Sequence, residues 1–192
     1  MRKNREFRPD REGTGQLNKL WPTPTQQLRA LRWLLFSVVC LVGLLAQDVL
    51  LYRVNILGGC TDLVPCIVLM VVVLQGAESG SIFALVMSVL YYFSGSSAGF
   101  YVIPLLTAVA VFVVIFRQAF LRQGLGAMLL CLAMGLALYE LGLFAISLFL
   151  ELTVASRVGA ALMTALVSLL AVPVLYPVLL AIGKLGGETW KE

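Results

Sequence analysis

Histidine is absent from this chain of 192 residues, and charged residues are scarce. Without histidine, the chain lacks the commonest general base, proton carrier and metal ligand of proteins. Only 12% of its residues are charged, whereas a soluble domain typically has about 25%. Hydrophobic residues make up 60% of the chain, and the mean hydropathy is +0.97. The composition therefore predicts a single-domain, polytopic membrane protein rather than a soluble enzyme.

Cysteine is also infrequent, with four residues that form no metal-binding pattern. Cys40 and Cys131 lie inside apolar runs, where a free cysteine behaves as a small hydrophobic side chain. Cys60 and Cys66 have the spacing C-x5-C, which leaves a disulfide open if their loop is extracytoplasmic. We expect no catalytic residue, no metal and no cofactor.

Positive charge is concentrated at the N-terminus, where residues 1–32 hold eight of the fourteen lysines and arginines. No folded nucleic-acid-binding motif accompanies them and few aromatic residues are interleaved, so we expect no nucleic-acid partner. We expect 1–29 to be a basic, disordered cytoplasmic tail near anionic lipid headgroups. Residues 30–185 would form the membrane domain, and 186–192 a short cytoplasmic tail.

Six apolar runs follow the basic tail, at 33–52, 63–77, 79–93, 100–116, 123–150 and 158–183. The second and third contain 15 residues each. At about 1.5 Å per helical residue, each would be shorter than the roughly 30 Å of a bilayer core. They are separated by Glu78, which lies between Gly76 and Gly80. This region could be one helix with a buried charge, two short helices joined by a tight turn, or a re-entrant hairpin.

The distribution of lysine and arginine favours the turn. With six spans and a cytoplasmic N-terminus, twelve basic residues fall on the inner side and two, Arg53 and Arg157, on the outer side. A glutamate inside one long helix would also cost a few kcal/mol. Glycines at the junction permit a short turn with positive φ. Charge alone does not distinguish this arrangement from a re-entrant hairpin.

Other polar or helix-breaking residues lie within the apolar runs. Glu140, next to Tyr139, is at membrane depth and could meet a partner helix, a proton, a ligand or an internal hydrogen-bond donor. Pro173 and Pro177 should kink the last helix. The sequence GSSAG, 95–99, matches the nucleophile-elbow pattern, but that site needs a strand and a histidine, so we interpret it as a turn. Asp48 and Arg53 would form a solvated interfacial pair.

The order of these features resembles the MreD family, small membrane proteins of the bacterial rod-shape (elongation) machinery. The resemblance lies in the segments DLVPCIVLMVVVL, QGAESGSIFALVMSVLYYFSGSSAGFYVIPLL, LYELGLF and VLYPVLLAIGK, within about residues 60–185. Family members commonly have an aspartate after the proline of the second helix and another near the end of the third. Here Cys66 follows Pro65, and Tyr91 or Tyr92 stands near the second position.

The resemblance implies an all-α protein of six transmembrane helices in the bacterial inner membrane, with both termini cytoplasmic. It implies a non-catalytic scaffold of cell elongation. The implied partners are an MreC-like bitopic protein, a RodA-type glycosyltransferase with its transpeptidase, the MreB filament and membrane lipids. Candidate partner or structural contacts are Pro65, Gly76, Glu78, Gly80, Tyr139, Glu140, Pro173 and Pro177.

The alternative function is the substrate-binding S component of an energy-coupling-factor transporter, whose helix arrangement MreD-like proteins resemble. Such a subunit needs a pocket with polar groups facing its ligand. The outer segments offer few candidates, namely Asp48, Asn55, Asp62 and Glu151. The first helix lacks an obvious A-x-x-x-A pattern, although Ser37, Cys40, Gly43 and Ala46 form a stripe of small residues.

Overall fold

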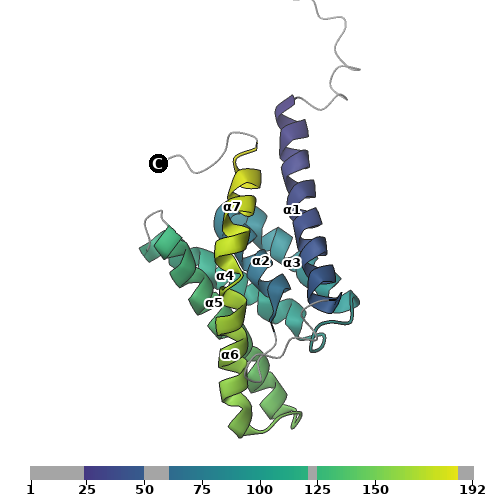
Figure 1. The fold of residues 1–192 in the computed structure, drawn as a ribbon, viewed down its shortest axis with the longest axis vertical. Coiled ribbons are helices and arrows are strands. Elements are labelled where there is room, and N and C mark those ends of the chain that lie inside the picture. Colours follow the sequence, from purple (N-terminus) through teal and green to yellow (C-terminus); the bar gives the residue numbers. More distant parts are fainter. Residues whose placement is uncertain (1–23, 50–60, 121–124, 186–192) are drawn as a thin grey trace, which may run out of the picture.

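The structure is a computed structural model that describes residues 24–49, 61–120 and 125–185. All the regular elements in these ranges are helices (Figure 1). They are α1 (Pro24–Val49), α2 (Leu63–Gln75), α3 (Ala77–Phe93), α4 (Val102–Phe120), α5 (Leu125–Phe149), the short 3₁₀ helix η2 (Ala155–Arg157), α6 (Val158–Leu169) and α7 (Val172–Gly183).

Helix α2 occupies the centre of the bundle. Every residue from Val64 to Val73 is buried, and the helix packs against α1, α3, α4, α5, α6 and α7. A helix that is apolar on all sides is stable only when neighbours enclose it. The continuous run of Val, Ile, Leu and Met in α2 therefore accounts for its central position.

Helices α2 and α3 form an antiparallel hairpin with one residue, Gly76, between them. Gly76 has φ of 88°, a backbone conformation that glycine adopts without a steric penalty. At the other end of the pair, the Tyr91 hydroxyl at the end of α3 reaches Asp62 at the start of α2. Gly80 lies so close to α2 that a Cβ would be 3.0 Å from the Val72 Cα. The predicted turn between two short helices, with positive φ at a glycine, is confirmed.

Close packing also joins α1 to this hairpin. A Cβ at Gly43 would lie 2.3 Å from the Ile67 Cδ1, so this glycine lets α1 approach α2. Trp33 and Phe36 of α1 pack against Phe83 of α3. Gly43 of the small-residue stripe is thus used inside the chain, and Cys40 of the same stripe is buried.

The predicted kink in the last apolar run is present as a break between α6 and α7. The two helices meet at an angle of 49° across Leu170 and Ala171. Pro173 follows this break. Proline disfavours continuation of the preceding helix, because it has no N–H to donate and its ring clashes with the carbonyl four residues earlier. Pro177 lies inside α7.

Two helices, α1 over residues 26–49 and α5 over 126–149, are long and apolar enough to cross a membrane. The bent pair α6 and α7 would be a third span if it acts as one. Helices α2, α3 and α4 are apolar but shorter. The membrane character predicted from composition is therefore supported; helix length in the described ranges gives two or three candidate spans, so the six predicted spans are not confirmed.

The two ends of the described chain lie at the same end of the bundle (Figure 1): the start of α1 and the end of α7 are both opposite the connection between α5 and α6. Helix α1 begins at Pro24, earlier than the boundary predicted at residue 30. Proline suits the first position of a helix, where its missing N–H would have no partner. Residues 1–23 lie outside the described part of the chain.

We expect Gly80→Ala and Gly126→Ala to have opposite effects on stability. Alanine at 80 would press on the α2 backbone, and overpacking typically costs about 1–3 kcal/mol. Nothing lies within 4 Å of a Cβ at Gly126, so alanine there should gain about 0.5–1 kcal/mol through helix propensity. Thermal unfolding of both variants in detergent measures this; equal shifts would contradict the close contact at Gly80.

Candidate functional site

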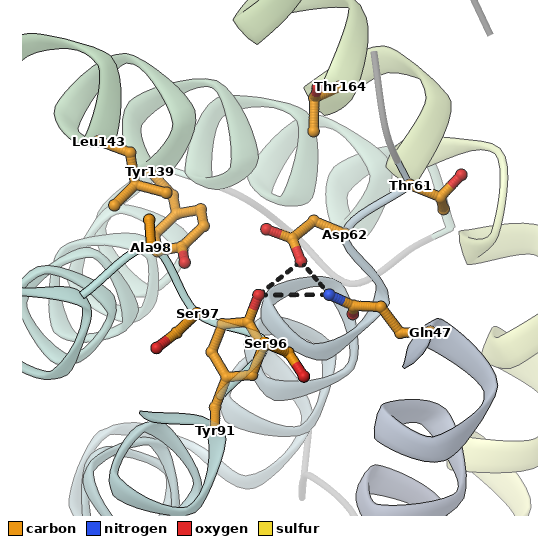
Figure 2. A pocket seen from close by; sticks show the side chains of 10 residues that line it. All are labelled: Gln47, Thr61, Asp62, Tyr91, Ser96, Ser97, Ala98, Tyr139, Leu143 and Thr164. Atoms are coloured by element: carbon orange, nitrogen blue, oxygen red, sulfur yellow. Dashed lines mark hydrogen bonds between the residues drawn. The ribbon is translucent and has the colours of Figure 1, made fainter. Parts of the chain in front are cut away.

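A polar cluster forms where the ends of four helices meet. Gln47 comes from the last turn of α1, Asp62 from the residue before α2, Tyr91 from the last turn of α3 and Ser168 from the end of α6. Figure 2 shows Asp62, Tyr91 and Gln47 directed toward one another. The cluster lies at the end of the α2–α3 hairpin opposite Gly76.

The Asp62 carboxylate accepts two hydrogen bonds on one oxygen. Gln47 Nε2 donates to Oδ1 at 2.7 Å, and the Tyr91 hydroxyl donates to the same atom at 2.8 Å (Figure 2). Gln47 Nε2 also lies 3.3 Å from the Tyr91 hydroxyl oxygen. Three segments distant in sequence are thus joined through a single carboxylate oxygen.

Asp62 holds the N-cap position of α2 but does not cap it. An aspartate there commonly accepts a hydrogen bond from the first turn of its own helix, and the Asp62 side chain makes no such bond. Instead, the Gln47 Oε1 accepts hydrogen bonds from the N–H groups of Leu63 at 3.0 Å and Val64 at 3.1 Å. Because α1 supplies the cap, the Asp62 carboxylate is available for other interactions.

Ser168 ties the break between α6 and α7 to the start of α2. The Asp62 N–H donates to the Ser168 hydroxyl at 2.8 Å, and the Cys66 thiol donates to the Ser168 carbonyl at 3.6 Å. Cys66 is a buried free thiol. Cys60, its possible disulfide partner, lies outside the described residues, as does Arg53, the expected partner of Asp48. Among the described residues, Asp48 accepts a hydrogen bond from the Ser96 hydroxyl.

A partly open cavity of about 250 Å³ adjoins Asp62. Its lining combines hydroxyl, amide, carboxyl and apolar groups from Gln47, Thr61, Asp62, Tyr91, Ser96, Ser97, Ala98, Tyr139, Leu143 and Thr164 (Figure 2). The segment 96–98 belongs to the GSSAG sequence, which forms the predicted turn between α3 and α4. The turn is therefore also a wall of the cavity.

Tyr139 faces Asp62 across this cavity (Figure 2). Its side chain is fully buried, and its hydroxyl has no hydrogen-bond partner among the described residues. Leaving a buried polar group unpaired typically costs about 1–3 kcal/mol. The Tyr139 hydroxyl therefore has unused hydrogen-bonding capacity beside the cavity.

The electrostatic character of the site is acidic. Asp62 lies just before α2, and burial of its carboxyl raises its pKa, although hydrogen bonds from Tyr91 and Gln47 act in the opposite direction. Glu140 of α5 is close enough to interact electrostatically with Asp62. The residues that line the cavity include neither lysine nor arginine.

Two of the residues singled out from the sequence lie at or next to this site. Tyr139 lines the cavity, and Glu140 is only 7% exposed, with its Oε1 unpaired among the described residues. Its burial inside the chain favours an internal role over direct contact with a partner helix. Pro65 is buried in the first turn of α2, where a proline removes no helical hydrogen bond.

The other predicted residues lie elsewhere. Glu78 is exposed in the first turn of α3, between Gly76 and Gly80, at the opposite end of the hairpin. A carboxylate there interacts favourably with the positive end of the helix dipole. Pro173 and Pro177 are exposed on α7. The structure does not bring these residues into the polar cluster.

Gln47 and Tyr91 were not predicted as site residues, and Asp62 was considered only as one of several outer acids. Sequence offered one signal, an acidic residue one helical turn before Pro65 at the start of an apolar run. The convergence of Gln47 and Tyr91 on it depends on helix packing, which no local pattern encodes.

The chemistry available at the site is hydrogen bonding and charge. No group of three or more His, Cys, Asp or Glu residues that could hold a metal occurs in the described ranges. A carboxylate, two phenols, an amide and several hydroxyls instead suit a ligand that donates hydrogen bonds.

Comparison with known proteins found no matching family model, no similar curated protein and no similar solved structure.

We expect Asp62 and Tyr91 to be energetically coupled. Asp62→Ala and Tyr91→Phe should each reduce stability, and the double variant should lose less than the sum by about 0.5–3 kcal/mol, because both remove one hydrogen bond. The free energy of unfolding of the wild type, the two single variants and the double variant, measured in mild detergent, gives the coupling energy. Glu78→Ala with Tyr91→Phe is the matched pair, which should be additive. Additivity in the Asp62 pair would show that this bond contributes nothing.

Proposed function

We propose that this chain is an MreD-type scaffold of the bacterial cell-elongation complex. In this role it joins an MreC-like bitopic protein and the peptidoglycan synthases, a RodA-type glycosyltransferase with its transpeptidase, to cytoplasmic MreB. It acts as a multi-pass protein of the inner membrane with both termini cytoplasmic, and it catalyses no reaction.

The observation that carries the proposal is the hairpin of α2 and α3. The resemblance rests on a proline-containing apolar helix, a glycine-flanked turn and a third helix that ends in a small-residue loop. These features correspond to Pro65 in α2, the break at Gly76 and the loop 94–99 after α3. The segments that carry the resemblance are therefore adjacent parts of one structural unit.

The positions of charged residues indicate which end of the α2–α3 hairpin faces the cytoplasm in the proposed topology. Arg117 near the end of α4 donates a hydrogen bond to the Val73 carbonyl near the end of α2, at the same end as Glu78. This end faces the cytoplasm in the proposed topology, in agreement with the excess of basic residues in inner segments. Asp62, Asp48 and the 94–99 loop lie at the other end, toward the periplasm.

The two departures from the family pattern are next to each other in space. Cys66, which replaces an expected aspartate, bonds to Ser168, and Tyr91, near the other expected aspartate, bonds to Asp62. Asp62 precedes Pro65 rather than following it. An acidic group is thus present at the outer end of α2, one turn from the expected position, which supports the proposal.

A second candidate is the S component of an energy-coupling-factor transporter. The cavity beside Asp62 favours it, because such a subunit needs a ligand pocket. The packing of α1 opposes it, since Cys40 is buried and Gly43 packs against Ile67 of α2, so neither is available to a coupling subunit. We therefore place the scaffold first.

Photo-crosslinking from the two ends of the hairpin tests the proposal. A photoreactive amino acid replaces Ala98 in one variant and Glu78 in another, both exposed positions. In native membranes, Ala98 should crosslink an MreC-like protein with an extracytoplasmic domain, because that domain lies on the outer side. Glu78 should not crosslink that domain and serves as the matched control.

The captured proteins are identified by mass spectrometry. Recovery of an MreC-like protein through Ala98, with cell-wall synthases, would support the scaffold. Recovery of paired ATPases with a membrane coupling subunit would replace it with the transporter candidate. Capture of an extracytoplasmic partner through Glu78 alone would overturn the proposed orientation.

A further inference from the structure

We propose that the cavity between Asp62 and Tyr139 is a binding site for a small organic cation, an ammonium or guanidinium group. The inference rests on the cavity itself and goes beyond either proposed function. The group could belong to a free amine or to a basic side chain of a partner, since both present the same chemistry.

The Asp62 carboxylate is held in place to receive such a group. Both hydrogen bonds that the carboxylate accepts from described residues involve Oδ1, and they come from Gln47 and Tyr91. Its backbone N–H is fixed separately by Ser168 at 2.8 Å. The donors therefore orient the carboxylate without using Oδ2, for which the structure gives no hydrogen bond among the described residues.

Tyr139 supplies the second, independent observation. Its side chain lines the cavity, and its buried hydroxyl has no partner among the described residues. A tyrosine hydroxyl can accept a hydrogen bond from an ammonium or guanidinium N–H. A ligand that bridges Asp62 and Tyr139 would satisfy a group that the described residues leave unpaired.

The charge of the cavity lining and the volume of the cavity indicate which class of ligand fits. The lining contains the Asp62 carboxyl and neither lysine nor arginine. A cation is attracted to an ionised carboxylate, whereas an anion is repelled by it. The volume of about 250 Å³ is below the range typical of drug-sized ligands, about 300–1,000 Å³. A guanidinium or short alkylammonium group fits this space.

The test uses the full chain in detergent with methylguanidinium and n-butylammonium as probes. Methylurea and n-butanol are the neutral counterparts of similar shape, and sodium chloride controls for ionic strength. Binding is measured by titration calorimetry and by the shift of the thermal unfolding midpoint. The variants are Asp62→Asn, Tyr139→Phe and, as a matched loss of a carboxylate at the far end, Glu78→Gln.

We expect both cations, and neither neutral probe, to bind the wild-type chain and Glu78→Gln. Asp62→Asn should weaken binding by about tenfold or more, because hydrogen bonds to charged groups are the strong ones. Tyr139→Phe should weaken it by about two- to tenfold while leaving the unfolding midpoint unchanged or higher, because an unpaired buried hydroxyl is removed. A purely structural tyrosine would not give this combination.

Two arms identify the source of the cation. A small amine retained by the purified chain in native mass spectrometry would indicate a free ligand, and displacement of a captured protein by methylguanidinium would indicate a partner side chain. Either supports the site. The proposal is overturned if the cations do not bind up to high millimolar concentrations, if the neutral probes bind equally, or if Glu78→Gln weakens binding as much as Asp62→Asn. Because the titration needs no partner, its failure is distinct from failure of the crosslinking experiment.

Discussion

Helix α2 has no exposed residue, and the positions of the other helices follow from its need for enclosure. Its thirteen residues are almost all apolar and have to be covered on every side. Helix α2 is therefore packed against α1, α3, α4, α5, α6 and α7. Glycines allow two of these approaches, Gly43 for α1 and Gly80 for α3. Because enclosure fixes where the neighbours run, it also fixes which helix ends meet. The polar cluster at Asp62 is therefore a product of the same packing that buries α2.

Gln47 of α1 caps α2 in place of Asp62, and this substitution connects the helix packing to the polar site. An aspartate that capped its own helix would have its carboxylate engaged with the backbone. Here α1 provides the cap through Gln47, and the carboxylate turns toward Tyr91 and the cavity. The same glutamine amide donates to Asp62, so stability and site geometry depend on one side chain. Tyr139 is the counterpart, because its buried hydroxyl has no hydrogen-bond partner among the described residues.

Local patterns in the sequence predicted the elements better than their assembly. The run of apolar residues, the glycines around Glu78 and the prolines of the last run were enough to predict the hairpin of α2 and α3 and the break before α7, because each depends on backbone geometry. The start of the membrane domain at residue 30 stays a prediction, while α1 itself begins at Pro24, a position that suits proline. The site was largely missed. Tyr139 and Glu140 were identified by their depth in an apolar run, but Gln47 and Tyr91 look like ordinary helix-end residues. Their convergence on Asp62 arises from contacts between segments 15 and 29 residues away along the chain.

The single residue between α2 and α3 also constrains how the chain is made. At about 1.5 Å per residue, neither helix alone is as long as a bilayer core is thick. In the proposed topology both helices enter the bilayer, and because Gly76 leaves no room for a separate loop they would enter as one pair. Such a pair would expose the uniformly apolar α2 to lipid until α4, α5, α6 and α7, which follow along the chain, cover it. The helix that is most enclosed in the finished bundle would therefore be exposed to lipid early in assembly.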